Sequence, residues 1–166
     1  VSETAYMQII NRAHDYVYIT TPYLILDNEM VTSLINAAQS GIDVRIITPH
    51  VADKWYVHMV TRSYYAQLIR GGVKIYEYTP GFIHSKMFVS DDQVAIVGTA
   101  NMDYRSFYLH FECGVLFYQS TMATKVRDDI LRTLKVCQPV ELDELNRAPL
   151  HHRAFTKLLR LIAPLM

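Results

Sequence analysis

One short segment of the chain carries side chains that could act on a phosphate ester. His84, Lys86 and Asp91 follow the pattern His-x-Lys-x4-Asp, and residues 98–101 read Gly-Thr-Ala-Asn soon afterwards. A neutral imidazole can attack phosphorus to give a phosphohistidine, and an imidazolium can protonate a leaving alkoxide. A neighbouring ammonium and amide can hold the non-bridging oxygens without a metal. The pattern therefore predicts metal-free phosphodiester chemistry.

The spacing assigns a role to each of these residues. His84 and Lys86 stand two apart on a predicted strand, so they project from one face toward one site. Lys86 and Asn101 are expected to hold the phosphate oxygens. The turn at Gly98 and Thr99 is expected to let the backbone approach the phosphate and to add a hydroxyl donor.

Asp91 belongs to the same pattern but sits at the end of the predicted strand, followed by a second aspartate. A carboxylate there can act in the chemistry, organise the turn or pair with a cation. The histidine pair at 151–152 lacks a Cys or carboxylate at ligand spacing, so it predicts solvated surface and no metal site.

Alternating β and α patterns precede the motif. A β-α-β-α-β order predicts an α/β fold with a mixed, largely parallel β-sheet flanked by helices. The first five predicted elements are a strand at 16–20, a helix at 27–39, a strand at 42–48, a helix at 57–70 and a strand at 73–78. Further strands are predicted at 83–89, 94–97 and 112–118, with a helix at 122–136.

Residues 1–145 are predicted to form one catalytic domain, and residues 146–166 an amphipathic helix packed on the domain or on lipid. In that tail, apolar residues from Phe155 to Leu165 form one stripe while Arg153, Lys157 and Arg160 keep their own helical spacing. The exposed-looking run Trp55-Tyr56-Val57 permits two interpretations, entry into a membrane interface or packing of the following helix.

Composition narrows the class of partner. The 166 residues are 51% apolar and 19% charged, and Lys+Arg and Asp+Glu both total 16, so no overall charge favours nucleic acid as a partner. No apolar run approaches the roughly 20 residues that span a bilayer. Because the chain begins at Val1 and enters a helical pattern at once, we expect a domain cut from a longer protein.

The motif and the Gly-Thr-Ala-Asn sequence resemble the HKD signature of the phospholipase D superfamily, with Thr99 where that family more often has Ser. Residues 101–112, the sequence Thr-Pro-Tyr at 21–23 and the ending resemble the carboxy-terminal catalytic half of bacterial cardiolipin synthase. The resemblance implies that Glu112 accepts a hydrogen bond from the far nitrogen of His84 and that Tyr23 lines the pocket mouth. His110 departs from the usual Asn.

The resemblance also implies a function: a phosphatidyltransferase that joins two phosphatidylglycerol molecules into cardiolipin and glycerol through a phosphohistidine, without cofactor or metal. A second HKD half must then come from a missing amino-terminal region or a homodimer mate, and His84 is either the nucleophile or the general acid/base. The expected location is the cytoplasmic side of the cell membrane. A dimeric phosphodiesterase or nuclease, and a noncatalytic lipid-binding or dimerisation module, are the alternatives.

Overall fold

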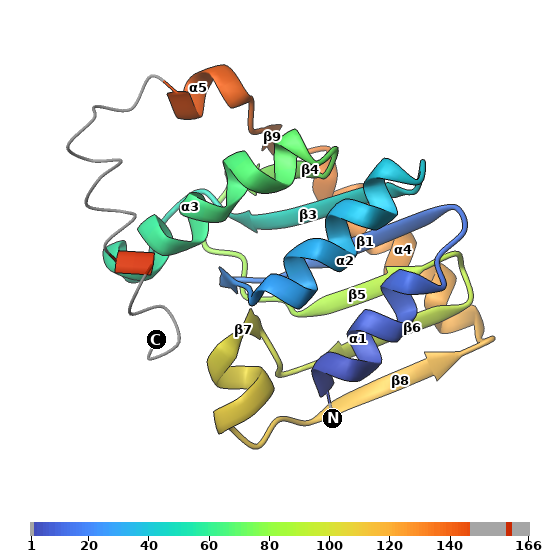
Figure 1. Ribbon diagram of the computed structural model, residues 1–166. Helices are drawn as coiled ribbons and strands as arrows, with labels where there is room; N and C mark the ends of the chain where they lie inside the picture. Colours follow the sequence, from blue (N-terminus) through green and yellow to red (C-terminus); the bar gives the residue numbers. More distant parts are fainter. Residues whose placement is uncertain (1, 147–158, 161–166) are drawn as a thin grey trace.

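The structure, a computed structural model, describes residues 2–146 and 159–160. Helices alternate with strands over most of this length (Figure 1). The helices are α1 (Ser2–Asn11), α2 (Asn28–Gln39), α3 (Trp55–Arg70), the π-helix η1 (Arg105–Leu109), α4 (Thr121–Leu134) and α5 (Leu142–Asn146). The strands are β1 (Tyr16–Thr20), β2 (Leu24–Ile25), β3 (Asp43–Pro49), β4 (Lys74–Tyr78), β5 (Met87–Ser90), β6 (Val94–Gly98), β7 (Met102–Asp103), β8 (Gly114–Tyr118) and β9 (Cys137–Pro139).

Seven strands form one sheet in the order β8-β6-β5-β1-β3-β4-β9. The pairs β1–β3 and β3–β4 are parallel, as the β-α-β-α-β pattern predicts. The β1–β5, β5–β6, β6–β8 and β4–β9 pairs are antiparallel. The predicted mixed α/β fold is confirmed, but the parallel part of this sheet is limited to β1, β3 and β4. A short turn joins β5 to β6, which permits an antiparallel pair without a crossover helix.

Local sequence signals set the limits of the helices that follow β1 and β3. Asp27 caps α2 by accepting a hydrogen bond from the Met30 amide at 2.8 Å, and the chain leaves that helix through Gly41 at φ 96°. Helix α3 ends at Gly71, and the following Gly72 also has φ 96°. Both left-handed positions suit glycine, which lacks the Cβ that would clash there.

The sheet separates two apolar layers (Figure 1). Helices α1, α2 and α3 cover one face, and the larger core there includes Leu34, Ile46 and Phe88. Helix α4 covers the other face, where Val126 and Ile130 pack on Ile47 and Val89. The central strands β1 and β3 are therefore buried on both faces, as continuous apolar runs require.

Three sequence expectations need revision or lie outside the described residues. The strand predicted from residue 83 begins only at Met87, and the short elements β2, β7, η1, β9 and α5 were not predicted. The predicted tail helix falls on residues 147–158 and 161–166, outside the described part. Arg160 is described: its guanidinium lies 4.0 Å from the Tyr64 ring centroid and donates to Gln67 at 3.0 Å.

The strand directions gather several loops at one edge of the sheet, the left-hand edge in Figure 1. Thr20 at the end of β1 faces Met87 at the start of β5, and Met87 faces Val97 near the end of β6. Gly98 faces Gly114 at the start of β8. We call this the motif edge because the segment 84–86 precedes β5 there. Among residues 2–146 and 159–160, no helix is both long and apolar enough to cross a bilayer.

Candidate active site

His84 and Lys86 lie in an extended segment just before β5. The ladder continues to this segment, because the Gly98 amide donates to the Lys86 carbonyl at 3.2 Å. The Thr20 hydroxyl fixes it from the β1 side by accepting the Met87 amide at 3.1 Å. Lys86 Nζ donates to the His84 carbonyl at 2.8 Å and lies 3.1 Å from the nitrogens of the His84 ring. The predicted pairing of imidazole and ammonium is therefore present.

The charges of two carboxylates act on this ammonium. Partial burial lowers the pKa of Lys86, while the negative charges of Glu112 and Asp103 act in the opposite direction. Asp103 is 5% exposed, and Glu112 has a side chain 15% exposed. The Lys86 ammonium is therefore subject to the charge of two carboxylates, and an ammonium is a strong donor to phosphate oxygens.

Gly98 serves a close approach between strands. A Cβ at Gly98 would lie 2.5 Å from the Cys113 carbonyl oxygen and 2.7 Å from Gly114 Cα, so a larger residue would push β6 from β8. The Thr99 amide donates to the same Cys113 carbonyl at 2.9 Å. The expectation that this glycine admits a phosphate is not supported by this packing, because neighbouring backbone already occupies the space.

The Thr99 hydroxyl is also engaged within the protein. It accepts the Cys113 amide at 3.0 Å and donates to Glu112 Oε2. A hydroxyl has one hydrogen, so in this arrangement Thr99 cannot also donate to a phosphate, as the sequence suggested. Thr99 instead orients Glu112. The hydrogen bonds of the described residues include none between Glu112 and His84, so that pairing stays a prediction.

Asn101 is held by a small buried network. The backbone N–H of Asn101 donates to Ser106 Oγ at 3.0 Å, and the backbone N–H of Ser106 donates to Asp103 Oδ1 at 2.7 Å. Asn101 Oδ1 is buried and has no hydrogen-bond partner among the described residues. Such an orphaned polar atom is costly unless a ligand or partner completes it. Asp103 therefore supports the site through Ser106, which the sequence analysis missed.

Asp91 lies at the opposite end of β5 from His84. At φ 55° it turns its carboxylate back to accept the amides of His14, Asp15 and Tyr16, at 2.8, 3.0 and 2.9 Å. The structure does not bring Asp91 into the candidate site. Its carboxylate organises the start of β1, one of the alternatives that the sequence left open.

Tyr23 lies at the motif edge, directly after β1. It is half-buried against the core, and its hydroxyl donates to Asp53 Oδ2 at 2.5 Å. Burial, and then the Asp53 carboxylate, raise the pKa of Tyr23. The position is compatible with the pocket mouth, and the contact also anchors the loop after β3.

Sequence reasoning missed Phe82 at the site and a buried carboxylate, Glu77, elsewhere on the sheet. The Phe82 ring lies 5.8 Å from the His84 ring, centroid to centroid, and an aromatic two residues before the motif histidine was a signal that could have been used. Glu77 is fully buried on β4, with Oε2 2.8 Å from His50 Nδ1 and Oε1 3.1 Å from Arg62. No pattern in the neighbouring sequence predicted that Glu77 would be buried.

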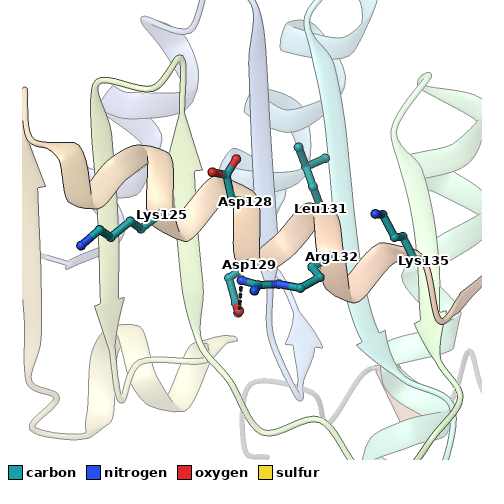
Figure 2. A pocket seen from close by; sticks show the side chains of 6 residues that line it. All are labelled: Lys125, Asp128, Asp129, Leu131, Arg132 and Lys135. Carbon is teal, nitrogen blue, oxygen red and sulfur yellow. Dashed lines mark hydrogen bonds and ion pairs between the residues drawn. The ribbon is translucent and has the colours of Figure 1, made fainter.

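A shallow hollow away from the motif lies along the outer side of α4 (Figure 2). Its lining residues all come from this helix and its carboxyl end, and Asp129 there pairs with Arg132 at 3.2 Å. A hollow lined by one exposed helix face encloses no ligand. No group of three or more potential metal ligands occurs in the described ranges.

The family model described as "Cardiolipin synthase, PLD-like domain" matches residues 6–134. The chain belongs to the phospholipase D-like family. This confirms the resemblance seen in the sequence. The match includes the His-x-Lys segment and the strands on both sides of it.

Similar proteins agree with this membership in the phospholipase D-like family. An uncharacterized protein of Streptococcus mutans serotype c is 45% identical over 100% of this chain and 36% of its own length. A cardiolipin synthase of Geobacillus sp. is 40% identical over 97% of this chain and 32% of its own. The solved phosphatidylserine synthase of Haemophilus influenzae Rd KW20 shares the fold, with TM-score 0.78 and 16% identity over 99% of this chain and 44% of that one. The chain spans about a third of the length of these curated relatives.

Proposed function

We propose that this phospholipase D-like domain supplies one of two HKD motifs to a phosphatidyltransferase that makes cardiolipin and glycerol from two phosphatidylglycerol molecules. The observation that carries the proposal is the Lys86 ammonium 3.1 Å from the nitrogens of the His84 imidazole. Relatives named cardiolipin synthase support the choice of lipid.

The reaction needs two histidines in alternating roles. One imidazole attacks the phosphorus of the first phosphatidylglycerol, a P–N bond forms, and the P–O bond to the glycerol headgroup breaks. The second imidazole protonates that departing glycerol. It then removes the proton from a headgroup hydroxyl of the second phosphatidylglycerol, whose oxygen attacks phosphorus and breaks the P–N bond. His84 can take either role.

Lys86 and Asn101 act on the phosphate in both steps. The ammonium offsets the charge that develops on the non-bridging oxygens, and the side-chain amide adds a neutral donor. A side-chain amide carries two N–H donors, so Asn101 can donate to a non-bridging oxygen of the phosphate. No metal is needed to supply this stabilisation.

A second HKD half must complete the site, because the chain contains one motif. Beside the motif, the region leading into β8 exposes Leu109, Phe111 and Val115 at 64, 107 and 55%. These apolar residues lie on both sides of Glu112 in the sequence, and β8 is an edge strand of the sheet. We place the second half against this surface, supplied either by the same polypeptide or by a homodimer mate.

The test is a transfer assay on vesicles of labelled phosphatidylglycerol, with a parallel assay for cleavage of single-stranded DNA, each with and without EDTA. The protein is assayed with its second half present. Labelled cardiolipin and glycerol in equimolar amounts, formed in EDTA, are the expected products. DNA cleavage without lipid transfer would identify a nuclease, and inactivity in both assays would favour the noncatalytic module.

A further inference from the structure

The loops after β3 and β4 expose large apolar side chains beside the site. Val51, Trp55 and Tyr56 lie in the first loop and at the start of α3, exposed at 49, 62 and 37%. Phe82 lies between β4 and β5 and is exposed at 37%. We call these four residues the Trp55 rim. The following Val57 is buried, so the packing interpretation of this run applies to Val57 and not to the two aromatic residues before it.

The Trp55 rim lies at the motif edge. Strand β3 runs parallel to β1, with Ile47 beside Thr20, and continues to its end at Pro49 before entering the rim. Since Met87 is also beside Thr20, the segments carrying Trp55 and His84 leave the sheet in the same direction. Figure 1 shows α3 beginning at this left-hand edge. The Phe82 ring lies beside the His84 ring, so this member of the rim is next to the candidate catalytic histidine.

Two polar contacts to the rest of the domain anchor the loop that carries Val51 and leads to Trp55. Asp53 accepts a hydrogen bond from the Tyr23 hydroxyl at 2.5 Å, and His50 Nδ1 is 2.8 Å from the buried Glu77. The rings of Trp55 and Tyr56 meet edge to face, with centroids 5.8 Å apart. The aromatic side chains are therefore presented outward by a fixed loop, which reduces the entropy lost when they enter another phase.

We infer that the Trp55 rim inserts into the headgroup–acyl boundary of a phospholipid bilayer and thereby seats the motif edge on its lipid substrate. Trp and Tyr favour this boundary because an apolar ring carries a polar N–H or O–H. The adjacent Lys54 is exposed and adds a cation suited to an anionic headgroup layer. The inference rests on the proposed lipid substrate and names the surface that reaches it.

Trp55 provides its own probe, because it is the single Trp of the sequence. The full chain is mixed with vesicles of equal parts phosphatidylglycerol and phosphatidylcholine, and tryptophan emission is recorded. A blue shift, together with quenching by phosphatidylcholine brominated on its acyl chains, is the expected result. Unchanged emission on vesicles that co-sediment with the protein would overturn the inference.

A matched variant controls for nonspecific adsorption. Tyr118 is exposed at 63%, close to the 62% of Trp55, but ends β8 at the opposite edge of the sheet. In the double variant Trp55→Phe with Tyr118→Trp, the relocated indole should show no shift and less quenching. Equal quenching at both positions would refute a specific docking edge.

Binding measurements complete the test. Trp55→Ala should weaken vesicle binding about 10-fold, the size expected for losing one large apolar side chain from an interface, whereas Tyr118→Ala should leave it unchanged. Equal affinity of Trp55→Ala and the unmodified chain would reject the proposal. These binding and fluorescence measurements do not require turnover. If Trp55 inserted into vesicles but no lipid transfer occurred, the proposed function would be rejected and the inference about membrane docking would stand.

Discussion

Strands β1, β3 and β4 are parallel neighbours, and β1 and β3 are largely buried, whereas β8 at one edge of the sheet exposes four of its five residues. The parallel half packs under α2 and α3. The antiparallel half carries the motif between β4 and β6 and ends in an uncovered strand. The comparison teaches that stability and chemistry are assigned to different strands, so substitutions in the two halves should have different consequences.

His84→Asn should have the largest effect on turnover. Asn cannot form the phosphohistidine or exchange a proton as imidazole does, so kcat should fall about 10³-fold or more. The side chain is exposed, and the unfolding free energy should stay within about 0.5 kcal/mol of the original. Turnover and denaturant unfolding are measured on the same preparation. A folded variant with normal turnover would remove His84 from the mechanism.

Glu112→Gln should reduce turnover about 100-fold, at the lower end of general acid–base effects. The amide keeps the shape that receives the Thr99 hydroxyl but removes the negative charge near Lys86 and the motif. Without the Glu112 charge the pKa of Lys86 should fall further, so the alkaline limb of the pH–rate profile should move to lower pH. Glu141→Gln, an exposed position, is the control. An unmoved profile would leave Glu112 as a structural partner of Thr99.

Ile46→Ala tests the parallel half. Ile46 is fully buried on β3, and truncating it should cost about 2 to 5 kcal/mol of unfolding free energy. Val115→Ala on β8, where the side chain is 55% exposed, should cost about 0.5 kcal/mol or less in the isolated chain. Urea denaturation compares the two variants. Equal losses would contradict the division between the two halves.

Asp91→Ala tests the junction of the halves. The change removes the acceptor of three amides at the start of β1 and places Ala at φ 55°, so about 2 kcal/mol should be lost. Asp91→Asn should recover part of this loss because an amide oxygen can still accept. Turnover of the folded fraction should not change. A selective fall in kcat would return Asp91 to the catalytic group.

Glu3→Gln should produce the smallest effect, visible only as a pH dependence. Burial, and then Asp27, raise the pKa of Glu3 from 4.5 to about 7, and Tyr108 bridges both carboxylates. The folded state then holds a proton that the unfolded state releases, so this contribution to stability is lost as pH rises from about 4.5 to about 7. The variant should melt above the original at pH 8 and show less change in Tm between pH 4 and pH 8. If Tm changed equally with pH in the variant and the original, the raised pKa of Glu3 would be contradicted.

The parallel half was the more predictable part of the fold. The strands at β1, β3 and β4 and the helices between them follow periodicities and glycine stops that local sequence encodes, and most boundaries agree within two residues. The error in β5, predicted from residue 83 but beginning at Met87, has a nonlocal cause. Pairing ends where β1 ends, at Thr20, and the chain before Met87 is extended without a full ladder.

For the candidate site, the residue types in the motif were enough to identify His84 and Lys86. They did not predict which contacts the other motif residues make. Thr99 could not be recognised as a hydrogen-bond partner of Glu112, because their contact depends on how closely β6 approaches β8 at Gly98. Ser106 acts through η1, whose form no periodicity predicted. Asp91 shares the motif spacing with His84, yet a strand carries it to the other edge.

The position of β1 between the two halves also has a consequence for folding kinetics. β1 pairs with β3 and β5, and the β5 contact joins residues about 70 positions apart, such as Val17 and Ser90. Each half can assemble from near neighbours, but joining them requires closing this long loop, which slows the folding step. We therefore expect the β1–β5 seam to form late in the folding transition, with the Asp91 carboxylate among the last contacts made.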